Sequence, residues 1–111
     1  MTIRERIRAI QAQVLAGPFT PAIAREHLMQ LTALYGLVLD EHRLADFEYA
    51  LTLLKFLESG EPVTRAEARA AVTPQYARVR EARDIERLTL EMIRGCKVSL
   101  RSLDEEMALA K

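Results

Sequence analysis

Two histidines and one cysteine are the side chains of this 111-residue chain best suited to metal binding or nucleophilic chemistry. His27 and His42 lack the Glu-x-x-His and His-x-x-x-His spacings that place two metal ligands on one face of a helix. Cys96 lies between Ile93 and Leu100 on an apolar side, where a cysteine usually packs as a small hydrophobic side chain. We therefore expect packed or partly exposed histidines, a buried thiol, and no metal ion or cofactor.

The carboxylates show no arrangement typical of general acid–base catalysis. The pairs Asp46/Glu48 and Asp84/Glu86 are two residues apart, and side chains with this spacing diverge around a helix. The sequence also contains no glycine-rich loop of the kind that binds phosphate groups. We therefore predict that the protein is not an enzyme.

Basic residues recur at helical spacing in the last part of the chain and form a basic stripe about 100° wide on a helix whose other side is apolar. The members of the basic stripe are Arg80, Arg83, Arg87, Arg94, Lys97 and Arg101. Guanidinium groups at this spacing can neutralise successive phosphates of a nucleic acid. One interpretation is therefore a surface that binds nucleic acid.

The alternative interpretation is a solvated face held by pairs at i,i+4, namely Arg80/Asp84 and Arg87/Glu91. The chain has 16 basic and 16 acidic residues, so its net charge gives no general attraction to nucleic acid. Residues 74–101 hold seven basic and four acidic residues, whereas residues 20–61 hold three basic and seven acidic residues. The opposite net charges of these two segments favour electrostatic pairing within or between subunits. Nucleic-acid binding is therefore the second hypothesis.

The elements that position these residues are predicted from caps and prolines. Threonine begins each of four segments, either in a Thr-x-x-Glu capping box or directly before a proline at the first helical position. The capping residues are Thr2 with Glu5, Thr20 before Pro21, Thr64 with Glu67, and Thr73 before Pro74. Strand and hairpin signals are absent. We predict an all-α fold with helices at residues 3–16, 21–58, 65–72 and 74–109.

The polar residues 40–43 lie inside the second predicted helix, yet the apolar spacing continues in phase across them. The residues of this seam are Leu31, Tyr35, Val38, His42, Ala45, Tyr49, Thr52 and Phe56. A loop would reset the phase, so we predict one unbroken, coiled-coil-like helix. Because helices 21–58 and 74–109 have similar lengths, we predict that they pair as a long antiparallel hairpin within a single domain, residues 1–111.

A second apolar face of helix 21–58 points roughly opposite the seam, at about 100° per residue. Its residues are Leu37, Leu44, Phe47, Leu51 and Leu54. One partner helix can cover only one face, and the two remaining helices are short. We therefore predict that a second copy of the chain covers this face in a homodimer or higher oligomer with a helical-bundle core.

The expected compartment is the cytoplasm. A single cysteine excludes an internal disulfide framework and fits a reducing environment. The start of the sequence has no apolar leader region, and no window approaches the ~18 apolar residues of a membrane span. We expect a cytoplasmic protein without membrane partners.

Three motifs stand out in the second half of the chain, namely Ala-Glu-Ala-Arg-Ala-x-Val-Thr-Pro-x-Tyr at 66–76, Glu-Ala-Arg-Asp at 81–84, and Ile-Arg-Gly-Cys-Lys-x-Ser-Leu-Arg-Ser-Leu at 93–103. With these motifs, residues 65–107 resemble small helical proteins of bacteriophages and prophages. The resemblance implies an accessory factor of a phage or mobile element, located in the host cytoplasm, and no specific functional residue. The first hypothesis is protein–protein binding, by an assembly factor or an inhibitor of a host or defence protein. The second is a nucleic-acid-binding accessory in recombination or DNA packaging. A third is a purely structural oligomer without an external ligand.

Overall fold

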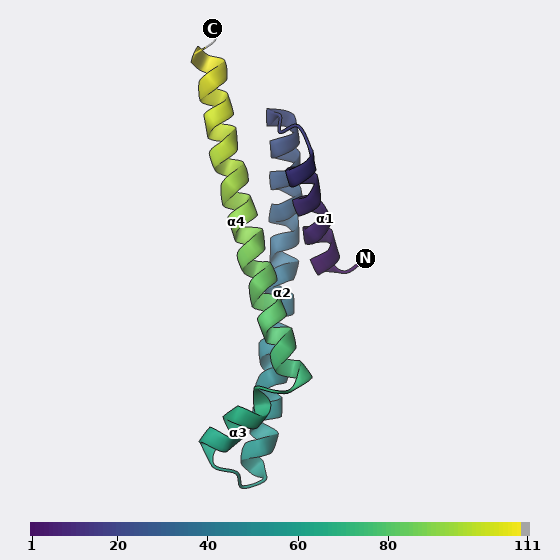
Figure 1. Ribbon diagram of the computed structural model, residues 1–111, viewed down its shortest axis with the longest axis vertical. Helices are drawn as coiled ribbons and strands as arrows, with labels where there is room; N and C mark the ends of the chain where they lie inside the picture. Colours follow the sequence, from purple (N-terminus) through teal and green to yellow (C-terminus); the bar gives the residue numbers. More distant parts are fainter. Residues whose placement is uncertain (110–111) are drawn as a thin grey trace. The chain divides into compact units, whose positions relative to one another are not determined.

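The computed structural model describes residues 1–109, which form four α-helices and no strand (Figure 1). The helices are α1 (Ile3–Ala16), α2 (Pro21–Glu58), α3 (Val63–Ala70) and α4 (Pro74–Leu109). The prediction of an all-α fold built on a helical hairpin is confirmed. The predicted bounds of α1, α2 and α4 are also those of the structure.

Three of the four predicted threonine caps form. The Oγ1 atom of Thr2 accepts from the backbone N–H of Glu5 at 3.1 Å, and that of Thr20 accepts from Ile23 at 3.3 Å. Thr73 accepts from the N–H of Tyr76 at 3.4 Å at the start of α4. Each bond satisfies a backbone donor that the first helical turn leaves without a partner, and so fixes where the helix begins.

The predicted bounds of α3, residues 65–72, are wrong by two residues. The helix starts at Val63 because the N–H of Ala66 already bonds the carbonyl of Pro62, and no side chain caps this end. It stops at Ala70, where the N–H groups of Val72 and Thr73 bond carbonyls three residues back. This tightened turn precedes Pro74, which has no N–H to continue a helix.

The helix α2 is unbroken across residues 40–43, as the phase of its apolar spacing predicts. Every residue of the predicted seam is buried or half-buried, with Leu31, Val38 and Ala45 among the most buried. A periodic apolar seam therefore determines this helix more strongly than the local polar cluster does.

Two compact units make up the chain, and α2 and α4 contribute to both. The first unit combines Met1–Leu37 with the described part of Arg87–Lys111. Figure 1 shows α1 beside the first half of α2, which it joins through a short turn. The buried residues of this unit come from three helices and are Ile7, Ile10, Ala24, His27, Leu31, Thr89, Ile93 and Cys96. On its surface Arg25 of α2 meets Asp104 of α4 at 3.4 Å.

The second unit is Val38–Glu86. Its buried residues are Val38, Ala45, Ala66, Ala70, Val79 and Ile85. Two alanines form the buried side of α3, and their small side chains allow close helix approach. The guanidinium of Arg69 in α3 lies 4.6 Å from the ring centre of Phe56, near the end of α2, and makes a cation–π contact between the two helices.

Helices α2 and α4 run antiparallel within the second unit. His42 pairs with Glu86, whereas Glu48, further along α2, pairs with Arg78, which comes earlier in α4. The rings of Tyr49 and Tyr76 lie 5.4 Å apart at 48°, a tilted aromatic contact at the same interface.

Candidate interaction surfaces

The predicted second apolar face of α2 lies at the surface of the chain. Leu44, Phe47, Leu51 and Leu54, which we call the outer face, all belong to the second unit, and each is between 44% and 60% exposed. Leu37, the fifth predicted member, is 47% exposed at the end of the first unit. Neither α3 nor α4 covers the outer face, because both pack on the seam side of α2.

The outward position of these residues follows from helix geometry. The seam side of α2 is already occupied, and a helix that is apolar on two opposite sides can bury only one of them against a single layer of neighbours. The outer face therefore remains in solvent in the isolated chain. Scattered apolar residues on a surface are ordinary, but four large ones in line on one helix are a candidate binding surface.

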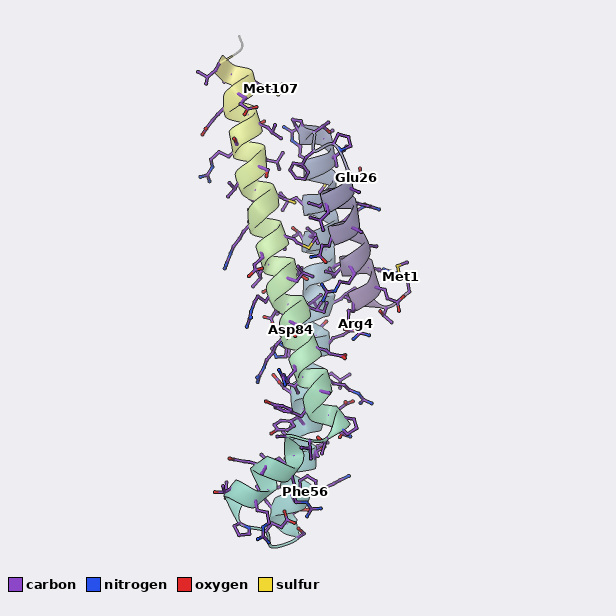
Figure 2. The ribbon with its side chains drawn as sticks, viewed as in Figure 1. Met1, Arg4, Glu26, Phe56, Asp84 and Met107 are labelled. Carbon is purple, nitrogen blue, oxygen red and sulfur yellow. The ribbon has the colours of Figure 1, made fainter. Side chains whose placement is uncertain are left out.

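All six residues of the basic stripe are exposed on α4. Figure 2 shows nitrogen-tipped side chains projecting outward along this helix. Arg80 and Arg83 belong to the second unit, and the other four belong to the first. Each unit thus presents part of the basic stripe to solvent.

The predicted pairs Arg80/Asp84 and Arg87/Glu91 do not form. Among residues 1–109 no ion pair involves a member of the basic stripe. These long side chains are exposed to water, where an i,i+4 pair gives only about 0.2–0.5 kcal/mol. The acidic side of α2 instead pairs with Arg78, whose guanidinium lies 3.0 Å from Glu48.

One cluster that the sequence did not reveal joins α2 to α4. The Nδ1 atom of His42 is hydrogen-bonded to Glu86, and its Nε2 atom lies 3.3 Å from a carboxylate oxygen of Asp46. The Asp46 contact is not a hydrogen bond, because Nε2 has no hydrogen-bond partner. In the sequence, the only signal for this cluster is the position of His42 on the seam with Asp46 four residues later. The cluster joins two helices within the second unit.

The remaining candidate residues are buried. His27 is 5% exposed within the core of the first unit, where its Nδ1 atom has no hydrogen-bond partner. Cys96 is a free, buried thiol, and burial raises its pKa because the thiolate would lose its hydration. A cysteine in this environment is a poor nucleophile.

No group of three or more His, Cys, Asp or Glu side chains within residues 1–109 is arranged to hold a metal ion. A shallow depression beside the turn between α3 and α4 is lined by Val72, Thr73, Tyr76 and Arg80, among others. It holds no convergent set of polar groups of the kind that orients a small ligand. In the described part of the chain, no helix is both long enough and apolar enough to cross a membrane.

The surfaces that remain as candidates are the outer face and the basic stripe. Both suit binding of another macromolecule better than they suit chemistry on a small molecule. Comparison with known proteins found no matching family model, no match among curated proteins and no match among solved structures.

Proposed function

We propose that this chain is a non-enzymatic helical interaction protein that assembles with itself and binds other proteins. The observation that carries the proposal is the exposure of Leu44, Phe47, Leu51 and Leu54 along one side of α2. With about half of each side chain in solvent, the outer face presents on the order of 400 Å² of apolar surface, the range in which a surface patch is often functional.

In the setting implied by the resemblance of residues 65–107, the protein is an accessory factor of a phage or mobile element. Its role there is that of an assembly factor or of an inhibitor of a host or defence protein. The outer face supports this role because a helix with exposed large apolar residues can dock into the groove of another helical protein. This role takes place in the host cytoplasm.

The double substitution Leu44→Gln with Leu51→Gln tests the proposal by sedimentation velocity. Both residues are exposed in the single chain, so the variant should fold as the wild type does, as circular dichroism can verify. We expect self-association to weaken by roughly a hundredfold or more, because large apolar anchors carry most of the energy of an interface. The matched control is Leu15→Gln, at a residue of α1 that is 81% exposed.

The two variants separate the outcomes. Loss of association in Leu44→Gln/Leu51→Gln but not in Leu15→Gln supports the proposal. Association that survives the double substitution unchanged would assign the interface to another surface and overturn it.

A second function, nucleic-acid binding in recombination or packaging, is supported by one specific observation. The basic stripe makes no ion pair among residues 1–109, so its guanidinium groups do not have to leave carboxylates in order to bind phosphates. The test is a fluorescence-polarisation titration with single- and double-stranded DNA and RNA across salt concentrations. We expect the variant Arg87→Glu/Arg94→Glu to lose salt-sensitive binding, and the charge-matched control Arg43→Glu/Arg65→Glu to retain it. Equal binding by the two variants would refute this function.

A further inference from the structure

The outer face follows a heptad repeat. Leu44 and Leu51 occupy one set of positions seven residues apart, while Phe47 and Leu54 occupy a second set, with alternating steps of three and four between neighbours. This spacing keeps the four side chains along a single line of the helix, as in one strand of a coiled coil. A second helix with the same heptad repeat can pack along these four side chains.

We propose that the outer face packs against the outer face of a second copy of this chain, with the two α2 helices antiparallel about a two-fold axis. This inference rests on the self-association proposed above and adds its orientation and register. In the proposed register Leu44 faces Leu54 of the partner subunit, and Phe47 faces Leu51 of the partner subunit. By two-fold symmetry each of these contacts occurs twice, so four apolar layers form.

The position of Asp40 favours the antiparallel orientation. In a parallel, in-register pair each Asp40 would face its own copy between the apolar layers of Leu37 and Leu44. Two like charges confined there would be desolvated and would repel one another. In the antiparallel register Asp40 lies opposite Glu58 of the partner subunit, beyond the last apolar layer and at the end of α2, where water can solvate both carboxylates.

The charges beside the outer face fit the proposed register. Glu41 and Lys55 flank the same side of the face, both are exposed, and neither is in an ion pair among residues 1–109. In the antiparallel register Glu41 lies opposite Lys55 of the partner subunit, and symmetry repeats the pair. In the parallel arrangement these positions would meet Gly36 and Ala50, which carry no charge. That arrangement would set Arg43 opposite Glu48 of the partner subunit, but Arg43 is already paired with Asp40 and Glu48 with Arg78 within each chain.

The residues near the two-fold axis are also compatible with close approach. Ala50 would meet its own copy there, and its small side chain leaves room for the second helix. Glu48 would approach its own copy on the opposite flank. Its charge is already compensated within each subunit by Arg78, at 3.0 Å.

A charge-reversal experiment tests orientation and register together. Glu41→Lys and Lys55→Glu are prepared separately, and their dissociation constants are measured by sedimentation equilibrium alone and as a mixture. Alone, each variant places like charges opposite one another twice, and we expect association to weaken roughly tenfold. In the mixture both pairs are again attractive, so we expect heterodimers at close to the wild-type dissociation constant.

The control is Arg43→Glu, an exposed charge on the other flank of the outer face. Its reversal should change the dissociation constant by no more than about twofold. Mixing Arg43→Glu with Lys55→Glu should not bring the dissociation constant back to the wild-type value. Circular dichroism verifies that all three variants remain helical.

The outcomes distinguish this inference from the proposed function. If the wild type associates and only the Glu41→Lys/Lys55→Glu mixture recovers, the antiparallel register is supported. If the wild type associates but the mixture does not recover, the register is wrong while self-association stands. If the wild type does not associate at all, both proposals fail.

Discussion

Leu44 and Ala45 are adjacent in α2 and face opposite environments, with 58% of Leu44 in solvent and 7% of Ala45. Ala45 is buried inside the second unit, whereas Leu44 begins the outer face. The larger and more apolar of the two side chains is therefore the exposed one. This inversion is unfavourable for a chain that remains alone, because roughly 25 cal/mol is lost for each Å² of apolar surface left in water.

We predict that two helical glycines can be replaced with a gain in stability. A Cβ atom built at Gly36 or Gly95 would meet nothing within 4 Å, so neither glycine is needed for close helix packing. Each substitution to alanine should raise the free energy of unfolding by up to about 1 kcal/mol, because alanine loses less backbone entropy in a helix. Urea denaturation followed by circular dichroism measures the change.

The contrasting variant is Gly60→Ala. Gly60 has a φ of 90° in the turn between α2 and α3, a conformation in which a Cβ atom is strained. This substitution should lower the free energy of unfolding by about 1 kcal/mol. A loss of stability in Gly36→Ala similar to that in Gly60→Ala would contradict the structure around Gly36.

We predict that His42 stabilises the second unit through its hydrogen bond to Glu86. His42→Ala should lower the free energy of unfolding by about 1–2 kcal/mol, because it removes a half-buried contact between α2 and α4. Arg43→Ala, at the exposed neighbouring residue, should change it by less than about 0.5 kcal/mol. A double-mutant cycle with Glu86→Gln should show coupling between the two sites, and strictly additive effects would argue against the contact.

The thiol of Cys96 is predicted to be unreactive in the native chain. It is buried, and its raised pKa leaves less thiolate at pH 8 than an exposed cysteine would have. Reaction with a disulfide reagent should be slow before urea is added and fast afterwards. In a Cys96→Ala background, Val98→Cys should react quickly, because residue 98 is 65% exposed in the wild type. Equal rates for the two thiols would show that Cys96 is accessible.

The prediction of a single domain can be tested by equilibrium unfolding. Because α2 and α4 run without a break through both compact units, we expect one cooperative transition. The chain has no tryptophan, and in a Tyr35→Phe background the two remaining tyrosines, Tyr49 and Tyr76, make fluorescence report on the second unit, whereas circular dichroism reports on all helices. Coincident curves from the two probes support one domain, and separated midpoints would indicate two.

Much of this fold could be predicted from local signals. Thr20 and Thr73 mark where the long helices begin, and the seam through Leu31 and Ala45 keeps α2 continuous across its polar cluster. These features depend on residues close in sequence, so periodicity and capping rules are sufficient. The start of α3 was missed because Thr64 satisfies the sequence rule for a cap while Pro62 already provides the first carbonyl acceptor.

The side-chain pairings were less predictable. His42 with Glu86 joins residues that are 44 positions apart, and this contact depends on the register of α2 against α4, which no local spacing determines. The pair Arg80/Asp84 has the correct spacing but does not form, because the gain from an exposed pair is small against the entropy of two long side chains. The outer face was visible in the sequence as apolar spacing, and the structure adds that α3 leaves it uncovered.

In our proposal the outer face joins copies of this chain, and the most direct test is the mass of the wild-type protein in solution. Sedimentation equilibrium over a wide range of protein concentrations gives this mass without a label or a substitution. We predict a dimer or higher oligomer that dissociates on dilution. A mass equal to that of one chain at every concentration would contradict the account.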